Sequence, residues 1–159
     1  MLLLVFVLVY VTSTILPTID WANSSAEEIA RIGNAKIASQ KLAGAIDEIS
    51  IAPGNARATI KLFVDEKSSI DCNFSPGGQR KIDFNAEMIL PDAYNPYDRN
   101  CSAIAGRPVV CTGDTPVSAP QSVAVTCRLD AGSAIINGKR FADVIIEKDS
   151  LGTVLVKYA

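Results

Sequence analysis

The chain opens with the uncharged run MLLLVFVLVYVTSTIL at residues 1–16, and a second run, DWANSSAEEIARIGNAKIASQKLAGAIDEI, occupies residues 20–49. In the first run only Thr12, Ser13 and Thr14 are not apolar. As a helix this run would be about 24 Å long. A membrane span needs about 20 apolar residues, so the run is slightly short by itself. Residues 17–19 can extend it. We therefore expect this segment to enter a membrane or to be buried in an assembly.

The second run is rich in alanine and contains no strong helix breaker. Ser25 and Glu28 form a capping box, which would open a new helix only if the chain bends there. Pro17 is the expected site of any bend, because proline lacks a backbone donor and clashes with the preceding turn. An apolar stripe at approximately helical spacing consists of Ile29, Ile32, Ile37, Leu42, Ile46 and Ile49. The pattern predicts one long helix over residues 1–49, continuous or kinked, and an N-terminal helical unit over residues 1–50.

Three roles for this helix are open. A cleaved secretory signal needs a positive start and a small-x-small cleavage site, whereas no Lys or Arg precedes Arg31 and the first cluster of small residues lies at 22–26. A membrane anchor with a helical stalk does not call for an amphipathic, alanine-rich continuation. A filament does, because the distal half must pack against its own head and against neighbouring helices. The residues expected in the filament core are Leu2, Leu3, Leu4, Val5, Phe6, Val7, Leu8, Val9, Tyr10, Val11, Ile15 and Leu16.

After Pro53 and Gly54 the apolar period changes from helical to two, which is typical of strands. We expect strands over residues 56–64, 69–74, 79–90, 109–110, 121–129, 134–136, 141–147 and 153–158, with a polar loop at 91–105. Asn137-Gly138 is the preferred pair for a two-residue hairpin turn. The fold class is therefore α+β: a long N-terminal hydrophobic helix followed by a head at residues 51–159, predicted to be a small antiparallel β-sandwich or barrel-like sheet.

The four cysteines, Cys72, Cys101, Cys111 and Cys127, all lie in the predicted head and show no C-x-x-C spacing. An even number in a β-rich domain behind an apolar N-terminus indicates two disulfides formed outside the cytosol. Of the three connectivities we favour Cys101–Cys111, which closes the polar loop, with Cys72–Cys127, which ties two strands. Four buried free thiols are the alternative.

Three N-x-[ST] sequons begin at Asn23, Asn73 and Asn100 and are candidate glycosylation sites if the head is extracellular. The chain has no histidine and a net charge of −2, which argues against histidine-based catalysis and against nucleic-acid binding. It contains no G-x-G-x-x-G, P-loop or G-x-S-x-G motif. Carboxylates and tyrosines share the 91–105 loop, where sugar or Ca²⁺ binding is conceivable, but an exposed polar loop is the commoner outcome. We expect no catalytic residue, cofactor or metal.

The charge-free MLLLVFVLVYV, the helix ending KLAGAIDEISIAPGNARATIKLFV and the cysteine-containing β-rich head together resemble archaeal type IV pilin-like proteins with a class III signal peptide. The likeness is strongest over residues 1–64. In that family a short basic leader and a Q-x-S-x-E-F motif precede the hydrophobic stretch, whereas this sequence begins at the stretch itself. We expect either a start codon assigned at an internal Met or a mature chain recorded without its first residues.

The resemblance implies subunits that sit in the membrane before assembly machinery draws them into a helical, extracellular filament of identical copies. Their helices would form the filament core and their heads its surface, and adhesion or surface attachment is the expected role. A membrane-anchored extracellular binding module is the main alternative, and a secreted enzyme with an uncleaved anchor is a third.

Overall fold

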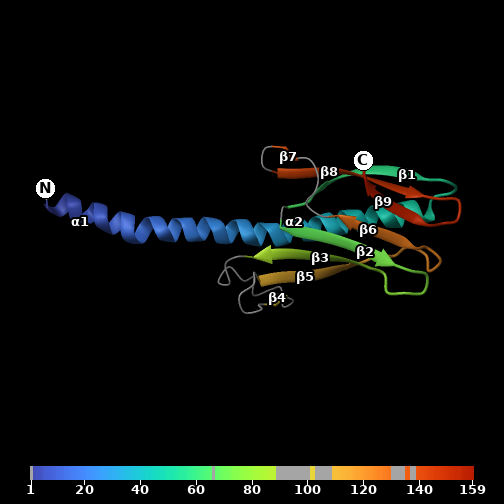
Figure 1. Ribbon diagram of the computed structural model, residues 1–159, viewed down its shortest axis with the longest axis horizontal. Helices are drawn as coiled ribbons and strands as arrows, with labels where there is room; N and C mark the ends of the chain where they lie inside the picture. Colours follow the sequence, from blue (N-terminus) through green and yellow to red (C-terminus); the bar gives the residue numbers. More distant parts are fainter. Residues whose placement is uncertain (1, 66, 89–100, 103–108, 130–134, 137–138) are drawn as a thin grey trace.

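A single long helix dominates the computed structural model, which describes residues 2–65, 67–88, 101–102, 109–129, 135–136 and 139–159. The helix consists of α1 (Leu2–Tyr10), a π-helical segment η1 (Val11–Ile15) and α2 (Leu16–Ile51). Its first part projects away from a β-rich head, and its last part lies inside that head (Figure 1). The predicted architecture of an N-terminal apolar helix followed by a β-sheet domain, α+β, is confirmed.

The π-helical segment ends two residues before Pro17, the expected site of a bend. Pro17 has no N–H, and in a regular α-helix its ring would press against the carbonyl four residues earlier. The turn is widened instead, and the N–H of Leu16 donates to the carbonyl of Val11, five residues back. The helix remains continuous and bends near this segment, as Figure 1 shows. Ser25 and Glu28 do not open a new helix, since α2 runs through them.

One face of α2 is buried from Ser25 onward, whereas the described side chains before Ser25 are exposed or, at Val11, half-buried. The sequence correctly placed four of its six stripe residues on this buried face. Ile29 and Ile37 are exposed on other faces of the helix. The buried stripe alternates steps of three and four residues, as an α-helix requires, and comprises Ser25, Glu28, Ile32, Ala35, Ser39, Leu42, Ile46 and Ile49.

Most strands lie close to their predicted positions, but β4 lies within the predicted loop at 91–105, and β5 extends well beyond the predicted strand at 109–110. They are β1 (Arg57–Phe63), β2 (Ser68–Phe74), β3 (Lys81–Met88), β4 (Cys101–Ser102), β5 (Val109–Pro116), β6 (Val125–Leu129), β7 (Ile135–Ile136), β8 (Lys139–Lys148) and β9 (Val154–Tyr158). Their order is β1-β8-β9-β6-β2-β3-β5-β4, with β7 paired to β8. The expectation of a purely antiparallel sheet is wrong, because β6 and β9 pair in parallel. The β7–β8 register leaves two residues at the turn, 137–138, which lie outside the described part of the chain.

The sheet surrounds the second half of α2. The helix contacts β1, β8 and β9 as well as β2, β3 and β5, and Figure 1 shows these two groups of strands on either side of it. One apolar cluster joins the buried helix residues, such as Leu42 and Ile46, to the inward side chains of the strands, such as Ile70, Phe84 and Val144. A boundary at residue 50 therefore separates two stretches of chain that share one core.

A lysine from β8 closes the end of α2. The ammonium group of Lys148 donates to the carbonyls of Ser50 and Ala52, at 2.8 and 3.0 Å. These carbonyls have no partner within the helix, and a cation is favoured at the negative end of the helix dipole. Pro53 and Gly54, whose φ is 68°, then turn the chain into β1. The lysine thus ties the last turn of the helix to the sheet.

Two disulfides join strands of the sheet, and they are the pairs that the sequence analysis favoured. Cys72 and Cys127 face each other across β2 and β6, and Cys101 and Cys111 face each other across β4 and β5. Among the described cysteines none is free. Both residues of the first pair are buried, so this bond is part of the apolar core.

We predict that the two disulfides contribute unequally to stability. A cross-link stabilises by restricting the unfolded chain, and the effect grows with the length of the closed loop. The sequence separations of 55 and 10 correspond to about 4 and about 3 kcal/mol. Denaturant unfolding of the double variant Cys72→Ala/Cys127→Ala should show the larger loss, and Cys101→Ala/Cys111→Ala the smaller. Free thiols in the unfolded, non-reduced wild-type chain would contradict the pairing.

A second prediction concerns Gly113 on β5, which lies opposite Phe84 on β3. A Cβ added at Gly113 would stand 2.3 Å from the Phe84 ring. We expect Gly113→Ala to destabilise the head by about 1–3 kcal/mol through overpacking. The matched control is Gly44→Ala in α2, where the added Cβ meets nothing within 4 Å and helix propensity favours alanine. Equal effects in urea unfolding would contradict the prediction.

Candidate assembly surface

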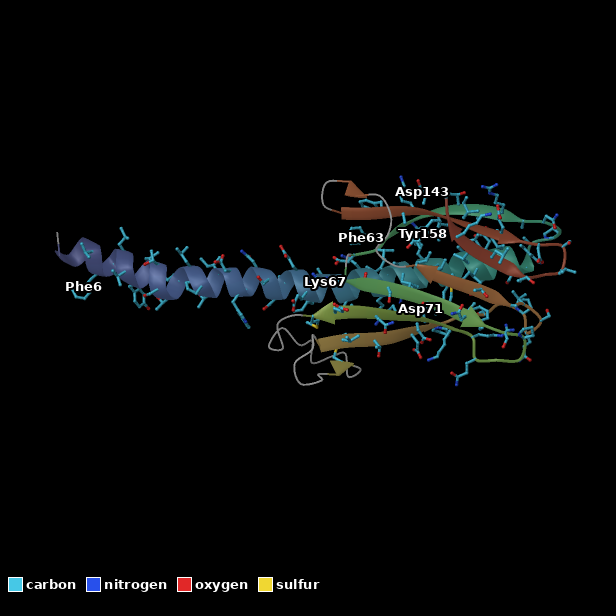
Figure 2. The ribbon with its side chains drawn as sticks, in the orientation of Figure 1. Phe6, Phe63, Lys67, Asp71, Asp143 and Tyr158 are labelled. Carbon is cyan, nitrogen blue, oxygen red and sulfur yellow. A yellow bond between two sulfur atoms is a disulfide. The ribbon has the colours of Figure 1, made fainter. Side chains whose placement is uncertain are left out.

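The first half of the helix presents apolar side chains to its surroundings on every side. Val5 to Tyr10, Ile15, Leu16 and Ile19 are exposed, and Phe6 is 69% exposed. Figure 2 labels Phe6 far from the head, on the projecting part of the helix. Large exposed apolar surfaces of this kind mark sites that another molecule or a membrane covers. All the residues expected in the filament core belong to α1, η1 or the first turn of α2.

In the described part of the chain, one helix is long and apolar enough to cross a membrane, Val5–Ile51, and none of its apolar window is buried. An apolar helix at this position indicates membrane insertion or a signal sequence. The two disulfides indicate that the head is extracellular, because disulfides persist in oxidising compartments. The exposed apolar segment before Ser25 and the disulfide-bonded head therefore differ in the environment that each suits.

The threonines of the apolar segment need no partner from outside the helix. Thr12 donates to the carbonyl of Leu8 at 3.0 Å, Thr14 donates to that of Tyr10, and Thr18 donates to that of Ile15 at 2.7 Å. A hydroxyl that bonds back to its own helix can be placed in an apolar environment without an unsatisfied donor. The polar positions of the segment are therefore compatible with lipid and with tight packing against other helices.

Asp20 and Trp21 lie between the apolar segment and the head. Both are exposed, Trp21 to 48%, and Asp20 is the single charged residue among residues 1–26. Trp21 stands four residues before Ser25, so it extends the buried stripe on the same helix face, below the head. Tryptophan at such a position fits a membrane–water interface as well as a contact with another protein.

The head is fixed to the helix by polar contacts that hold both in one orientation. The Arg31 side chain, mostly buried, pairs with Asp65 at 2.8 Å and donates to the carbonyl of Glu87 at 2.8 Å. Deeper in the head, the hydroxyls of Ser39 and Thr115 share a buried hydrogen bond of 2.7 Å. Together with the hydrogen bonds from Lys148 to the end of α2, these contacts set the rotation and the axial position of the head on the helix.

Several charged residues have partners that are distant in sequence. The carboxylate of Asp47 accepts a hydrogen bond from the N–H of Ser118. Arg57 pairs with Glu147, and Lys61 pairs with Asp143. The hydrogen bond from Lys148 to the carbonyl of Ser50 could not be predicted from local sequence, because its two residues are 98 positions apart. Of the glycosylation candidates, Asn23 is exposed on α2, Asn73 is exposed on β2, and Asn100 lies outside the described residues, as does the loop at 91–100.

A polar row crosses the outer face of the sheet. Asp71, Asp83 and Asp114 are neighbours in register on β2, β3 and β5, beside a shallow cavity of about 450 Å³. The ammonium of Lys81 lies 3.0 Å from Asp83 and 3.7 Å from Asp114. The hydrogen bond that the Lys81 ammonium donates to Asp83, followed by the negative charge of Asp83, raises the pKa of Lys81 above its usual value. Among the described residues no group of His, Cys, Asp or Glu could hold a metal ion.

No known protein family, curated protein or solved structure matches the chain. Function is therefore inferred from the geometry of this molecule. Within the described residues, its most distinctive surface is the exposed apolar segment of the helix, which continues without a break into the part of α2 that the head encloses.

We predict that Glu147 makes the head sensitive to acid. A hydrogen bond from Lys157, together with the charges of Lys157 and Arg57, lowers the pKa of Glu147 below its usual value. The resulting stability is present above the unfolded-state pKa and is lost as pH falls through the folded-state pKa. Between pH ~5 and pH ~3, Glu147→Gln should lose less stability than the wild type. The exposed Glu48, replaced by Gln, is the control; if the two variants behave alike, the prediction is wrong.

Proposed function

We propose that this protein is a structural subunit of an extracellular, archaeal type IV pilus-like filament, which polymerises through its N-terminal helix and serves in adhesion or surface attachment. In this proposal the subunit sits in the membrane before assembly, and pilus assembly machinery transfers it into the filament. The role is structural and not enzymatic. The finer description of the head as a pilin-like sandwich or barrel belongs to the same proposal.

The observation that carries the proposal is the continuity of the helix. The described part of the helix that lies outside the head, from residue 5 to residue 24, is about 30 Å long, which matches the thickness of a bilayer core. It continues without a break into the part of α2 that forms the centre of the head. A simple anchor works equally well through a flexible linker. A rigid connection gives every copy the same angle between apolar helix and head, which a regular assembly requires.

Packing among copies also removes the exposed apolar surface from water once the subunit leaves the membrane. The threonine hydroxyls donate to carbonyls of their own helix. The segment can therefore exchange lipid for other helices without losing hydrogen bonds, which supports assembly through this segment. Identical contacts that do not close into a ring generate a filament. The exposed segment and the disulfide-bonded head then become the inner and outer layers of one fibre.

Deleting residues 1–24 tests the proposal, because burial on α2 begins at Ser25. We expect the full chain to form filaments that electron microscopy can resolve and the deletion variant to be a soluble monomer in analytical ultracentrifugation. The control is Ile51→Ala in the full chain. It removes an exposed apolar side chain at the other end of the helix and should leave filaments intact. Filaments of normal width from the deletion variant would overturn the proposal, and a full chain that only inserts into vesicles would favour a membrane-anchored binding module.

A further inference from the structure

An apolar pocket of about 310 Å³ lies on the flank of the head, where α2 meets the edge formed by β1 and β8. Ile37 contributes to it from the helix, and Leu62, Phe63 and Phe141 contribute from the two strands. Ile37 is 63% exposed and Phe141 is 37% exposed. A pocket of this volume with exposed apolar side chains at its mouth is suited to an apolar occupant.

The walls of the pocket are held in place. Phe63 and Phe141 are directly opposite in the β1–β8 register, and their rings meet edge to face with centroids 5.3 Å apart. Figure 2 labels Phe63 beside the helix. The ammonium of Lys41 donates to the carbonyl of Lys61 at 2.8 Å, which joins the helix to the edge strand at the pocket rim. An occupant would therefore enter a site that is already formed, which limits the entropic cost of binding.

The rim of the pocket is positively charged. Lys41 and Lys61 both line it, and the carboxylate of Asp143 approaches Lys61 only to 3.8 Å. The complementary ligand is a large apolar or aromatic group next to a carboxylate. Aromatic side chains combine a large contact area with attraction for nearby cations.

This chain contains such a ligand at Asp20-Trp21, where an exposed tryptophan follows the single charge of residues 1–26. The pocket of the same copy is out of reach. Trp21 precedes Ile37 by 16 residues of regular α-helix, which places it about 24 Å along the axis and about 160° around it. Only the tryptophan of another copy can enter the pocket.

We infer that the pocket at Ile37, Phe63 and Phe141 receives Trp21 of a second copy, with Asp20 of that copy paired to Lys41 or Lys61. The inference rests on the proposed function, which it extends by naming the contact between subunits. Because pocket and tryptophan point in nearly opposite directions, each copy offers one of each to different neighbours. Such a head-to-tail contact leads to an open chain of subunits.

Photo-crosslinking in assembled filaments tests the contact. The full-length chain carries benzoylphenylalanine in place of Trp21, and mass spectrometry maps the crosslinks after irradiation. We expect intermolecular crosslinks to peptides that contain Ile37, Phe63 or Phe141. The same probe in place of Leu151, an exposed residue of the β8–β9 turn, should not label these peptides. Filaments whose Trp21 probe labels other surfaces would overturn the inference while leaving the filament itself established.

Charge exchange provides a second, independent measurement. Asp20→Lys and Lys41→Asp should each raise the critical concentration for filament formation by about tenfold or more, and the double variant should recover most of the loss. Trp21→Ala should have a similar effect, and Trp21→Phe a smaller one. A membrane-insertion assay and a circular dichroism spectrum of each variant serve as controls that the variant still inserts and folds. Normal filaments from all these variants would overturn the inference, whereas no filaments from the wild type would overturn the proposed function as well.

Discussion

The packing of the buried stripe of α2 against the surrounding strands is the interaction on which the rest of the molecule depends. Without the helix, the inward faces of β2, β3 and β8 would have no apolar partner, and without the strands the stripe would face water. The hydrophobic effect therefore joins helix and sheet into one unit, and no separate core is available to either. The polar contacts of Arg31, Ser39 and Lys148 then select one orientation among those that apolar packing alone allows.

Much of this fold was accessible from the sequence, because local patterns encode it. The change to a period of two predicted strands over residues 69–74 and 79–90, where β2 and β3 lie, and an asparagine-glycine pair predicted the β7–β8 hairpin. The parallel pairing of β6 with β9 was not accessible, since it joins segments whose sequences carry no mark of direction. The exposure of Ile37 was missed for a related reason: its spacing fits a helix, but which face is buried depends on where the sheet lies.

The candidate assembly surface was predicted in composition but not in detail. The uncharged run indicated an apolar helix, yet the widened turn before Pro17 and the back-bonded threonines follow from three-dimensional geometry. The pocket at the β1–β8 edge has no sequence signature, because Ile37, Phe63 and Phe141 come from three separate elements. In such a molecule, the sequence indicates that an apolar surface exists, and the fold determines in which direction that surface points.

The bond between Cys72 and Cys127 has a mechanical consequence. In the proposed fibre a subunit would carry tension, and tension that peels strands from the head would lengthen the chain. The bond closes a stretch whose ends are 55 residues apart in sequence, equivalent to about 190 Å of fully extended polypeptide. This stretch of chain cannot extend under tension while the disulfide is intact. The stretch of the head between these two cysteines therefore cannot lengthen, and in the proposed fibre tension would act on contacts between subunits and on the strands outside this stretch.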